Sequence, residues 1–136
     1  MDAETAREFI RANHHAVLAT NRRDGRPQLS PVACGVDSEG LVVISSRETA
    51  IKVKNLRRDP EASLCVLSDT FFGEWIQVDG SAEIVSLPAA MYGLVDYYRS
   101  VVGEHPDWDD YRAAMEREQR VLVRVRIERA GPDHSG

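Results

Sequence analysis

The chain has 136 residues, of which 43% are hydrophobic and 29% are charged, and its formal net charge is -5. A chain of this length is most simply one domain, and its interspersed charges are typical of a soluble globular protein rather than a disordered one. The acidic balance disfavours nucleic acid as a partner, and no apolar run approaches the roughly 20 residues that a membrane helix needs.

The apolar pattern predicts helices and strands separated by turn residues such as the Asp24-Gly25 pair. Helical spacing predicts helices, in chain order, at residues 3–13, 49–59, 87–101 and 108–119, with Pro88 in the first turn of the third. Strands are predicted at residues 15–20, 29–36, 41–46, 62–68, 74–85 and 121–129, the first three as a meander. Hairpin-connected strands with inserted helices indicate a mainly β fold, a small six-stranded antiparallel barrel with peripheral helices.

The domain boundaries follow from the same pattern. Residues 1–130 are predicted to form the single domain, and residues 131–136, with sequence GPDHSG, a disordered tail. The N-terminus is acidic and amphipathic, unlike a secretory signal. Cys34 and Cys65 each lie in an apolar run without a CxxC partner, which predicts free thiols in a cytoplasmic protein. No metal site is predicted, because the adjacent His14 and His15 would point to opposite faces of a strand.

The basic segment TAIKVKNLRRDP, residues 49–60, holds the only two lysines of the chain. On a helical wheel Ala50, Val53 and Leu56 form a narrow apolar stripe. Lys52 falls alone on one flank of this stripe, in the first turn. Lys54 and Arg58 fall together on the other flank, with Arg57 beside them. The positive charge is therefore predicted to divide between two sides of one helix.

The start of this helix allows two interpretations. A first helical turn has free N–H groups and the positive end of the helix dipole, so Lys52 with the hydroxyls of Ser45, Ser46 and Thr49 could bind a phosphate. Alternatively, Ser45 and Glu48 form a capping box and Lys52 is only solvated. The pattern alone leaves both interpretations open.

Three stretches resemble a known family: HAVLATNRRDGRPQLSPV, KVKNLRRDP and GEHPDWDDYRAAM. They are similar to the pyridoxamine 5'-phosphate oxidase-like FMN-binding split barrels, and most similar to the mycobacterial and actinobacterial branch that uses the deazaflavin coenzyme F420. The resemblance spans residues 9–129. It implies a split-barrel homodimer with cofactor sites at the subunit interface.

The resemblance also implies site residues. The cofactor phosphate would be held by Ser45, Ser46, Thr49 and Lys52. Ser30, Pro31 and Val32 would lie along the tricyclic ring, and the partner subunit would contribute Trp75 and Gln77.

The expected activity is a deazaflavin-dependent oxidoreductase reaction. Reduced cofactor would deliver a hydride to a small electron-poor organic acceptor, with the protein supplying orientation and electrostatics. No catalytic side chain is predicted. An FMN-dependent oxidoreductase of the same fold and a non-catalytic protein that binds F420 or flavin remain as alternatives.

Overall fold

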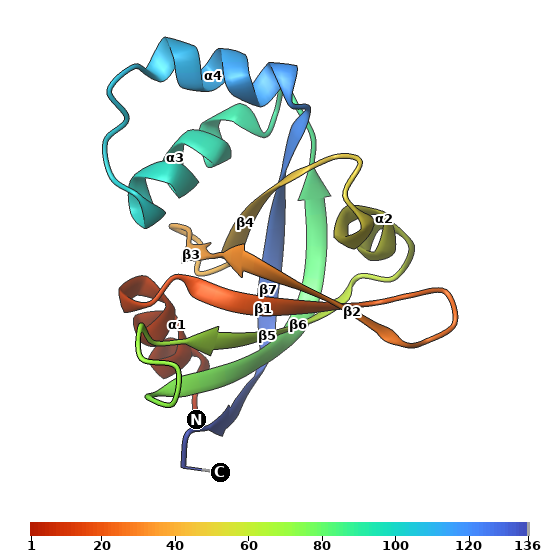
Figure 1. The fold of residues 1–136 in the computed structure, drawn as a ribbon, viewed down its shortest axis with the longest axis vertical. Helices are drawn as coiled ribbons and strands as arrows, with labels where there is room; N and C mark the ends of the chain where they lie inside the picture. Colours follow the sequence, from red (N-terminus) through yellow and green to blue (C-terminus); the bar gives the residue numbers. More distant parts are fainter. Residues whose placement is uncertain (136) are drawn as a thin grey trace.

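The computed structural model describes residues 1–135 and contains one antiparallel sheet of seven strands, curled into half a barrel, with four helices around it (Figure 1). The strands are β1 (His15–Asn21), β2 (Pro27–Ala33), β3 (Gly35–Val36), β4 (Val42–Arg47), β5 (Glu61–Leu67), β6 (Trp75–Val85) and β7 (Arg120–Asp133). The helices are α1 (Ala3–Ala12), α2 (Ile51–Arg58), α3 (Met91–Val101) and α4 (Trp108–Arg117). The strand order is β2-β1-β5-β6-β7-β4-β3, which is consistent with a split barrel.

The seventh strand arises because the predicted strand over residues 29–36 divides at Cys34. The N–H of Cys34 donates to the carbonyl of His14 at 2.7 Å, and the chain then leaves β1. β2 pairs with β1 at one edge of the sheet, whereas β3 pairs with β4 at the other edge. The predicted meander is therefore confirmed in part: its first hairpin forms, its second is limited to the short β3–β4 pair, and β4 otherwise pairs with β7.

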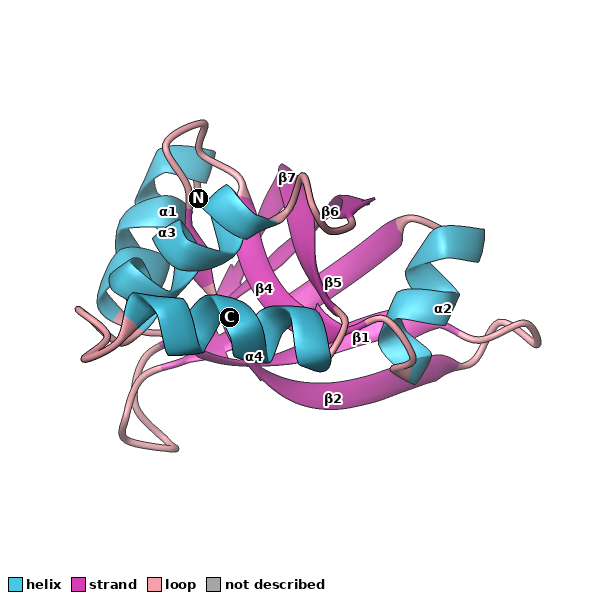
Figure 2. Ribbon diagram, turned by 90° about the horizontal axis from the view of Figure 1, so that it is seen from above, coloured by secondary structure: helices cyan, strands magenta, loops and turns pink. Residues whose placement is uncertain are grey.

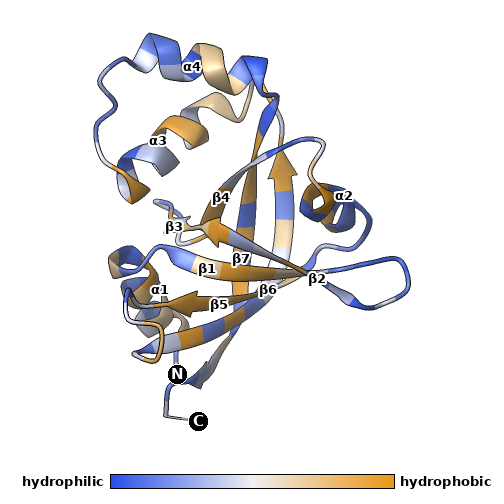
Figure 3. Cartoon of the chain, in the orientation of Figure 1, coloured by the Kyte–Doolittle hydropathy of each residue, from blue (hydrophilic) through white to orange (hydrophobic). Residues whose placement is uncertain are grey.

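Two hydrophobic cores hold the sheet. The inner core fills the curl with strand residues such as Leu18 and Val123 and is closed by Ile10 of α1. The second core lies between the outer face of β4 and β7 and the pair α3 and α4, with Leu94 and Leu122 at its centre. Figure 3 shows the strands largely in the hydrophobic colour where they line the curl. Figure 2 shows α2 on the opposite side of the molecule from α1 and α3.

Helix boundaries follow local capping. The Asp2 carboxylate accepts from the Thr5 N–H at 2.8 Å at the start of α1, and Asp107 accepts from the Asp110 N–H at 3.1 Å at the start of α4. Each of these two helices therefore begins at an aspartate side-chain cap. α3 begins at Met91, four residues after its predicted start, so Pro88 lies in the preceding turn instead of in the helix.

The C-terminal segment also differs from its prediction. β7 continues through Asp133, and the His134 N–H donates to the Trp75 carbonyl at 3.1 Å, so residues 131–133 extend the sheet where a disordered tail was expected. Gly136 lies outside the described residues. Within residues 1–135, none of the helices combines the length and the apolar character needed to cross a membrane.

Candidate functional site

α2 begins without a side-chain cap. Its N-cap residue is Ala50, its first turn holds no acidic residue, and within residues 1–135 the N–H groups of Ile51 and Lys52 make no hydrogen bond. The predicted capping box between Ser45 and Glu48 does not form, because Ser45 lies within β4 and the helix starts three residues after Glu48. The first turn therefore presents free donors and the positive end of the helix dipole, a combination that favours anions.

Lys52 lies at this uncapped turn and is half-buried. Partial burial, and next the positive charge of Arg120, lower the pKa of its ammonium group below the ordinary lysine value. Among the described residues no carboxylate forms a salt bridge with Lys52. A partly desolvated cation beside a second cation is electrostatically unfavourable until an anion joins them, so this position favours anion binding.

Arg120 is the residue of this site that the sequence did not reveal. It is the first residue of β7, and its Nε and Nη2 atoms donate to one carboxylate oxygen of Glu118 at 3.0 and 2.8 Å. These hydrogen bonds lower the pKa of the Glu118 carboxyl, and Arg47 lies 3.6 Å from the same oxygen. The β4–β7 register places Arg120 opposite Arg47. No local pattern could have signalled this proximity, because it depends on strand pairing across more than 70 residues.

The two predicted serines point to opposite faces of β4. Ser46 is buried on the inner face with Ile44, and its hydroxyl donates to the Arg47 carbonyl at 3.3 Å. Ser45 pairs with Leu122 on the outer face, beside α3. Thr49 is exposed just ahead of α2. Within residues 1–135 the hydroxyls of Ser45 and Thr49 make no hydrogen bond, whereas the Ser46 hydroxyl is bonded to the backbone.

Glu48 does not oppose an anion at this site. Its two carboxylate oxygens accept from Nη2 and Nε of Arg57 at 2.6 and 3.1 Å. Arg57 also donates to the Ser86 hydroxyl at 3.1 Å. This bidentate pair neutralises Glu48 and holds its carboxylate toward the flank of α2 that carries Arg57.

Ser30, Pro31 and Val32 lie on the edge strand β2. Ser30 pairs with the fully buried Leu18, so its side chain points to the inner face, where Val32 also packs; Pro31 is exposed on the other face. Proline has no N–H, so the position of Pro31 opposite Val17 implies that its nitrogen faces the open edge. In an antiparallel ladder every second residue shares this orientation, so β2 offers backbone groups along that edge.

Two further observations mark this edge. The Tyr97 hydroxyl of α3 donates to the Ala33 carbonyl at 2.9 Å, at the end of β2. Burial raises the pKa of this phenol. The Ser30 hydroxyl is buried and has no hydrogen-bond partner within residues 1–135. An unpartnered buried hydroxyl costs free energy, so it is a position at which a bound group could supply the missing partner.

Trp75 and Gln77 lie elsewhere in the protomer, on the outer face of β6. The cross-strand register places them on one face with residues of β1, β2 and β5. We call one part of this face the open sheet face; it consists of Val17, Ala19, Leu29, Pro31, Cys65, Leu67, Trp75 and Gln77, and it is flanked on the same side of the sheet by the polar residues His15, Ser63 and Asp79. Apart from Gln77 and Cys65, the six residues of the open sheet face have apolar side chains. None of the six belongs to either hydrophobic core. Leu29 is 61% exposed.

The structure therefore separates the predicted site residues into three places. Thr49 and Lys52 lie at the start of α2, with Ser45 on the adjoining strand. Ser30 and its neighbours lie on the β2 edge, and Trp75 with Gln77 lies on the open sheet face. The phosphate and ring roles of these residues therefore stay predictions.

Comparison with known proteins identifies the family. The family model for pyridoxamine 5'-phosphate oxidase matches residues 3–132. The chain belongs to this family. The pyridoxamine 5'-phosphate oxidase fold binds flavin-like cofactors, and the family contains oxidoreductases together with non-catalytic members.

Solved structures place the chain within this fold. A conserved hypothetical protein, Rv2991 of Mycobacterium tuberculosis, is 27% identical, with 96% of this chain and 82% of that protein covered and a TM-score of 0.77. A protein named F420 reductase is 22% identical, with 91% and 94% covered and a TM-score of 0.69. A heme binding protein from Mycobacterium smegmatis is also 22% identical, with a TM-score of 0.70. That match covers 94% of this chain but only 52% of the heme binding protein.

Proposed function

We propose that this member of the pyridoxamine 5'-phosphate oxidase family is a deazaflavin-dependent oxidoreductase that uses coenzyme F420 to reduce a small electron-poor organic acceptor. The observation that carries the proposal is the half-buried Lys52, which lacks a carboxylate partner and lies at an uncapped helix start. The choice of deazaflavin is supported by the stretches NLRRDP and GEHPDWDDYR, which resemble that branch of the family. The fold shared with an F420 reductase agrees with this choice.

The donors present fit a cofactor with a phosphate group. The ammonium of Lys52, the free N–H groups of the first turn of α2 and the Thr49 and Ser45 hydroxyls would hold the phosphate. Each charge-assisted contact contributes about 1.5–3 kcal/mol, so Lys52 alone would account for roughly 10- to 100-fold in affinity. The β2 edge around Pro31 would orient the ring system, and the Ser30 hydroxyl would gain a partner there.

When bound, the deazaflavin supplies the hydride that the acceptor receives. The chain contributes binding and orientation: cations and N–H groups at one end, and strand-edge backbone groups at the other. Tyr97 fixes the end of β2 against α3 through its 2.9 Å hydrogen bond to Ala33, which keeps the edge in place. No side chain of the described residues is assigned as an acid or base in this proposal.

We further propose that the protein is a homodimer that associates through the open sheet face. Most side chains of the open sheet face are apolar and pack in neither core, as expected of a surface that a partner covers, and the polar residues Ser63, Gln77 and Asp79 lie hydrogen-bonded beside them. Trp75 begins β6, seven residues or about 23 Å along the strand from Ala82. The N–H of Ala82 donates to the carbonyl of Pro60, just beyond α2. Trp75 is thus remote from α2 of its own chain, which supports the idea that Trp75 and Gln77 serve the site of the other subunit.

The dimer proposal is tested by placing a charge on the open sheet face. Leu29→Arg should shift the protein toward monomer in light scattering coupled to size exclusion, because the guanidinium would be buried against the second subunit. Val102→Arg is the matched control, since Val102, which follows the last residue of α3, is an apolar residue of similar exposure, 65% against 61%, outside that face. A wild-type monomer at micromolar concentration, or equal behaviour of the two variants, would contradict the proposal.

The cofactor proposal is tested by titration with coenzyme F420 and with FMN, following tryptophan fluorescence. Lys52→Ala should weaken F420 binding about 10- to 100-fold. Lys54→Ala, on the other flank of the same helix, should weaken it far less. Equal binding by Lys52→Ala and wild type would show that the phosphate site is misplaced. Tighter binding of FMN than of F420 would favour the FMN-dependent alternative.

Catalysis requires a separate measurement. Oxidation of reduced F420 is followed in the presence of a panel of enones and quinones. Turnover with an acceptor supports the oxidoreductase proposal. Tight F420 binding without turnover on any acceptor would favour the alternative of a non-catalytic cofactor-binding protein.

A further inference from the structure

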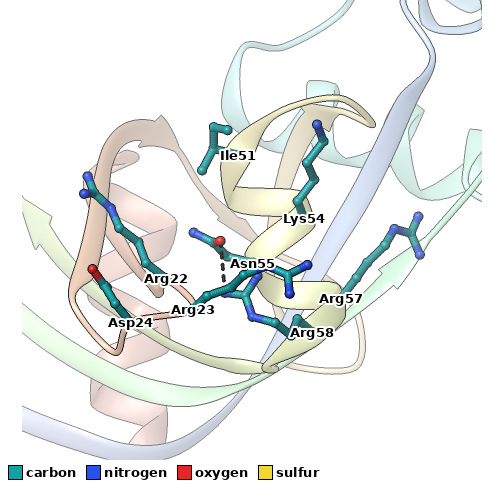
Figure 4. A pocket seen from close by; sticks show the side chains of 8 residues that line it. All are labelled: Arg22, Arg23, Asp24, Ile51, Lys54, Asn55, Arg57 and Arg58. Atoms are coloured by element: carbon teal, nitrogen blue, oxygen red, sulfur yellow. Dashed lines mark hydrogen bonds between the residues drawn. The ribbon is translucent and has the colours of Figure 1, made fainter.

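A second cationic site lies on the other side of α2 from Lys52. A pocket of about 670 Å³ opens between the β1–β2 hairpin and α2 (Figure 4). It is lined by Arg22, Arg23, Asp24, Ile51, Lys54, Asn55, Arg57 and Arg58. Five of these side chains are cations and one is a carboxylate, although the whole chain carries 17 Lys and Arg against 22 Asp and Glu. Positive charge is thus concentrated in one pocket of an acidic protein.

Most of this charge is not neutralised within the chain. The side chains of Arg22, Arg23 and Lys54 make no hydrogen bond and no ion pair among residues 1–135. Arg57 differs, since it is engaged by Glu48 and in Figure 4 extends away from the hairpin. Asp24 accepts from the Arg26 N–H at 3.0 Å within the hairpin turn. Three unpaired cations face one pocket, and their mutual repulsion favours a ligand that brings several negative charges.

Hydrogen bonds hold the side chains at the base of the pocket in place. Asn55 is 5% exposed, and its amide donates to the Thr20 hydroxyl of β1 at 3.1 Å. The amide oxygen of Asn55 accepts from Arg58 at 3.2 Å, and the same Arg58 nitrogen donates to the Asn21 carbonyl at 2.6 Å. This network holds one guanidinium against the hairpin. The opposite wall is fixed by the hairpin turn, in which Arg22 and Arg26 pair through their backbone at 2.9 Å.

The size and charge of the pocket define the class of ligand. Its volume lies in the range of small-molecule sites, and guanidinium groups match the planar oxygens of phosphates and carboxylates. A nucleic-acid duplex is disfavoured, because only five of the 17 Lys and Arg side chains line the pocket and the net charge of the whole chain is -5. Figure 3 shows the loop of the β1–β2 hairpin in the hydrophilic colour, and none of the residues that line the pocket is aromatic, so it offers no ring on which bases could stack.

We propose that the pocket between the β1–β2 hairpin and α2 binds an oligoanion, a small ligand with three or more consecutive phosphate or carboxylate groups. Arg22, Arg23 and Lys54 supply the charge, and Arg58, held by Asn55 and Asn21, supplies a pre-oriented donor. The site is distinct from the position at Lys52, since the helix places Lys52 and Lys54 on different flanks. It therefore does not depend on the identity of the cofactor.

The test is calorimetric titration of the full chain at about 50 mM salt with inorganic tripolyphosphate and, separately, with tetraglutamate. Orthophosphate and acetate serve as single-charge references and should bind much more weakly. The Arg23→Gln/Lys54→Gln variant should weaken oligoanion binding about tenfold or more. The matched control is Arg126→Gln/Arg129→Gln, which removes two exposed cations of β7 that do not line the pocket.

Each outcome decides the proposal. Tighter binding of tripolyphosphate identifies a phosphate chain as the ligand, and tighter binding of tetraglutamate identifies a carboxylate chain. Retained binding in Lys52→Ala separates this site from the cofactor phosphate position, even if that position is misassigned. The proposal is overturned if wild type binds neither oligoanion, or if the pocket variant and its control bind equally. It is also overturned if Lys52→Ala abolishes binding while the pocket variant does not.

Discussion

The buried amide of Asn55 is expected to stabilise the contact between α2 and the sheet. Asn55 points from α2 to Thr20, which is 1% exposed in β1, and Thr20 in turn donates to the Gln28 side chain of β2 at 3.4 Å. The Asn55→Ala substitution removes the donor to the Thr20 oxygen and the acceptor for Arg58. It leaves a buried hydroxyl oxygen without its donor.

The expected loss is worked out from these contacts. A neutral buried hydrogen bond contributes about 1 kcal/mol, and leaving its partner unsatisfied costs about 1–3 kcal/mol in place of that gain. The bond from the exposed Arg58 adds little, and alanine is a better helix former than asparagine by about 0.6 kcal/mol. The net destabilisation is therefore about 1.5–3 kcal/mol. For a chain of 136 residues this corresponds to a fall in Tm of about 5–10 °C.

Thermal and urea unfolding of Asn55→Ala, Thr20→Val and the double variant provide the assay. In the double variant the pair is replaced by apolar groups, so it should be about 1 kcal/mol more stable than the sum of the two single losses predicts. The reasoning is refuted if Asn55→Ala costs less than about 0.5 kcal/mol, or if the two substitutions are additive.

Two further predictions concern the sheet and the anion site. Gly80→Ala should destabilise the protein by more than about 3 kcal/mol in urea unfolding, because the added Cβ would lie 1.9 Å from the Arg126 carbonyl oxygen of β7; a loss below 1 kcal/mol would contradict the close approach. The affinity for F420 should be highest at pH values where the Lys52 ammonium group of the free protein is charged. It should fall as the pH rises through the lowered pKa of that group, below 10.5, because an anion stabilises the charged form. Lys52→Arg should give a flat profile over the same range, and a parallel fall in this variant would assign the titration to another group.

The sequence predicted the helices and strands better than their pairing. The runs that became β1, β5 and β6 were recognisable as short apolar stretches bounded by turn residues, and in the structure burial alternates along each of them. The break at Cys34 was not recognisable, because Cys34, Gly35 and Val36 continue an apolar run. The chain nevertheless crosses there to the other end of the sheet. That crossing depends on the curl of the whole sheet and leaves no mark in local periodicity.

The candidate site shows the same limit. The wheel placed Lys52 apart from Lys54 and Arg58, and the structure confirms that separation, with Val53 and Leu56 buried between the flanks. The wheel could not exclude a capping box, because Ser45 and Glu48 have the required spacing. In the structure β4 continues through Arg47, and the carboxylate of Glu48 forms an ion pair with Arg57 and does not cap the helix. The proximity of Arg120 to Lys52 could not be predicted from the sequence, because it depends on the β4–β7 register.

The division of charge across α2 allows one short helix to face both of the anion sites proposed above. Its inner stripe, Val53 with Asn55 and Leu56, is buried and fixes the rotation of the helix about its axis. With that rotation fixed, Lys52 must lie toward Arg120 and the end of β4, and Lys54 toward the β1–β2 hairpin. A substitution of a buried residue of this stripe should weaken anion binding at both sites, whereas removing a charge on one flank should leave binding at the other flank unchanged. The two flanks can therefore be tested independently, and a coupled loss from Lys54→Gln alone would show that the helix rotates.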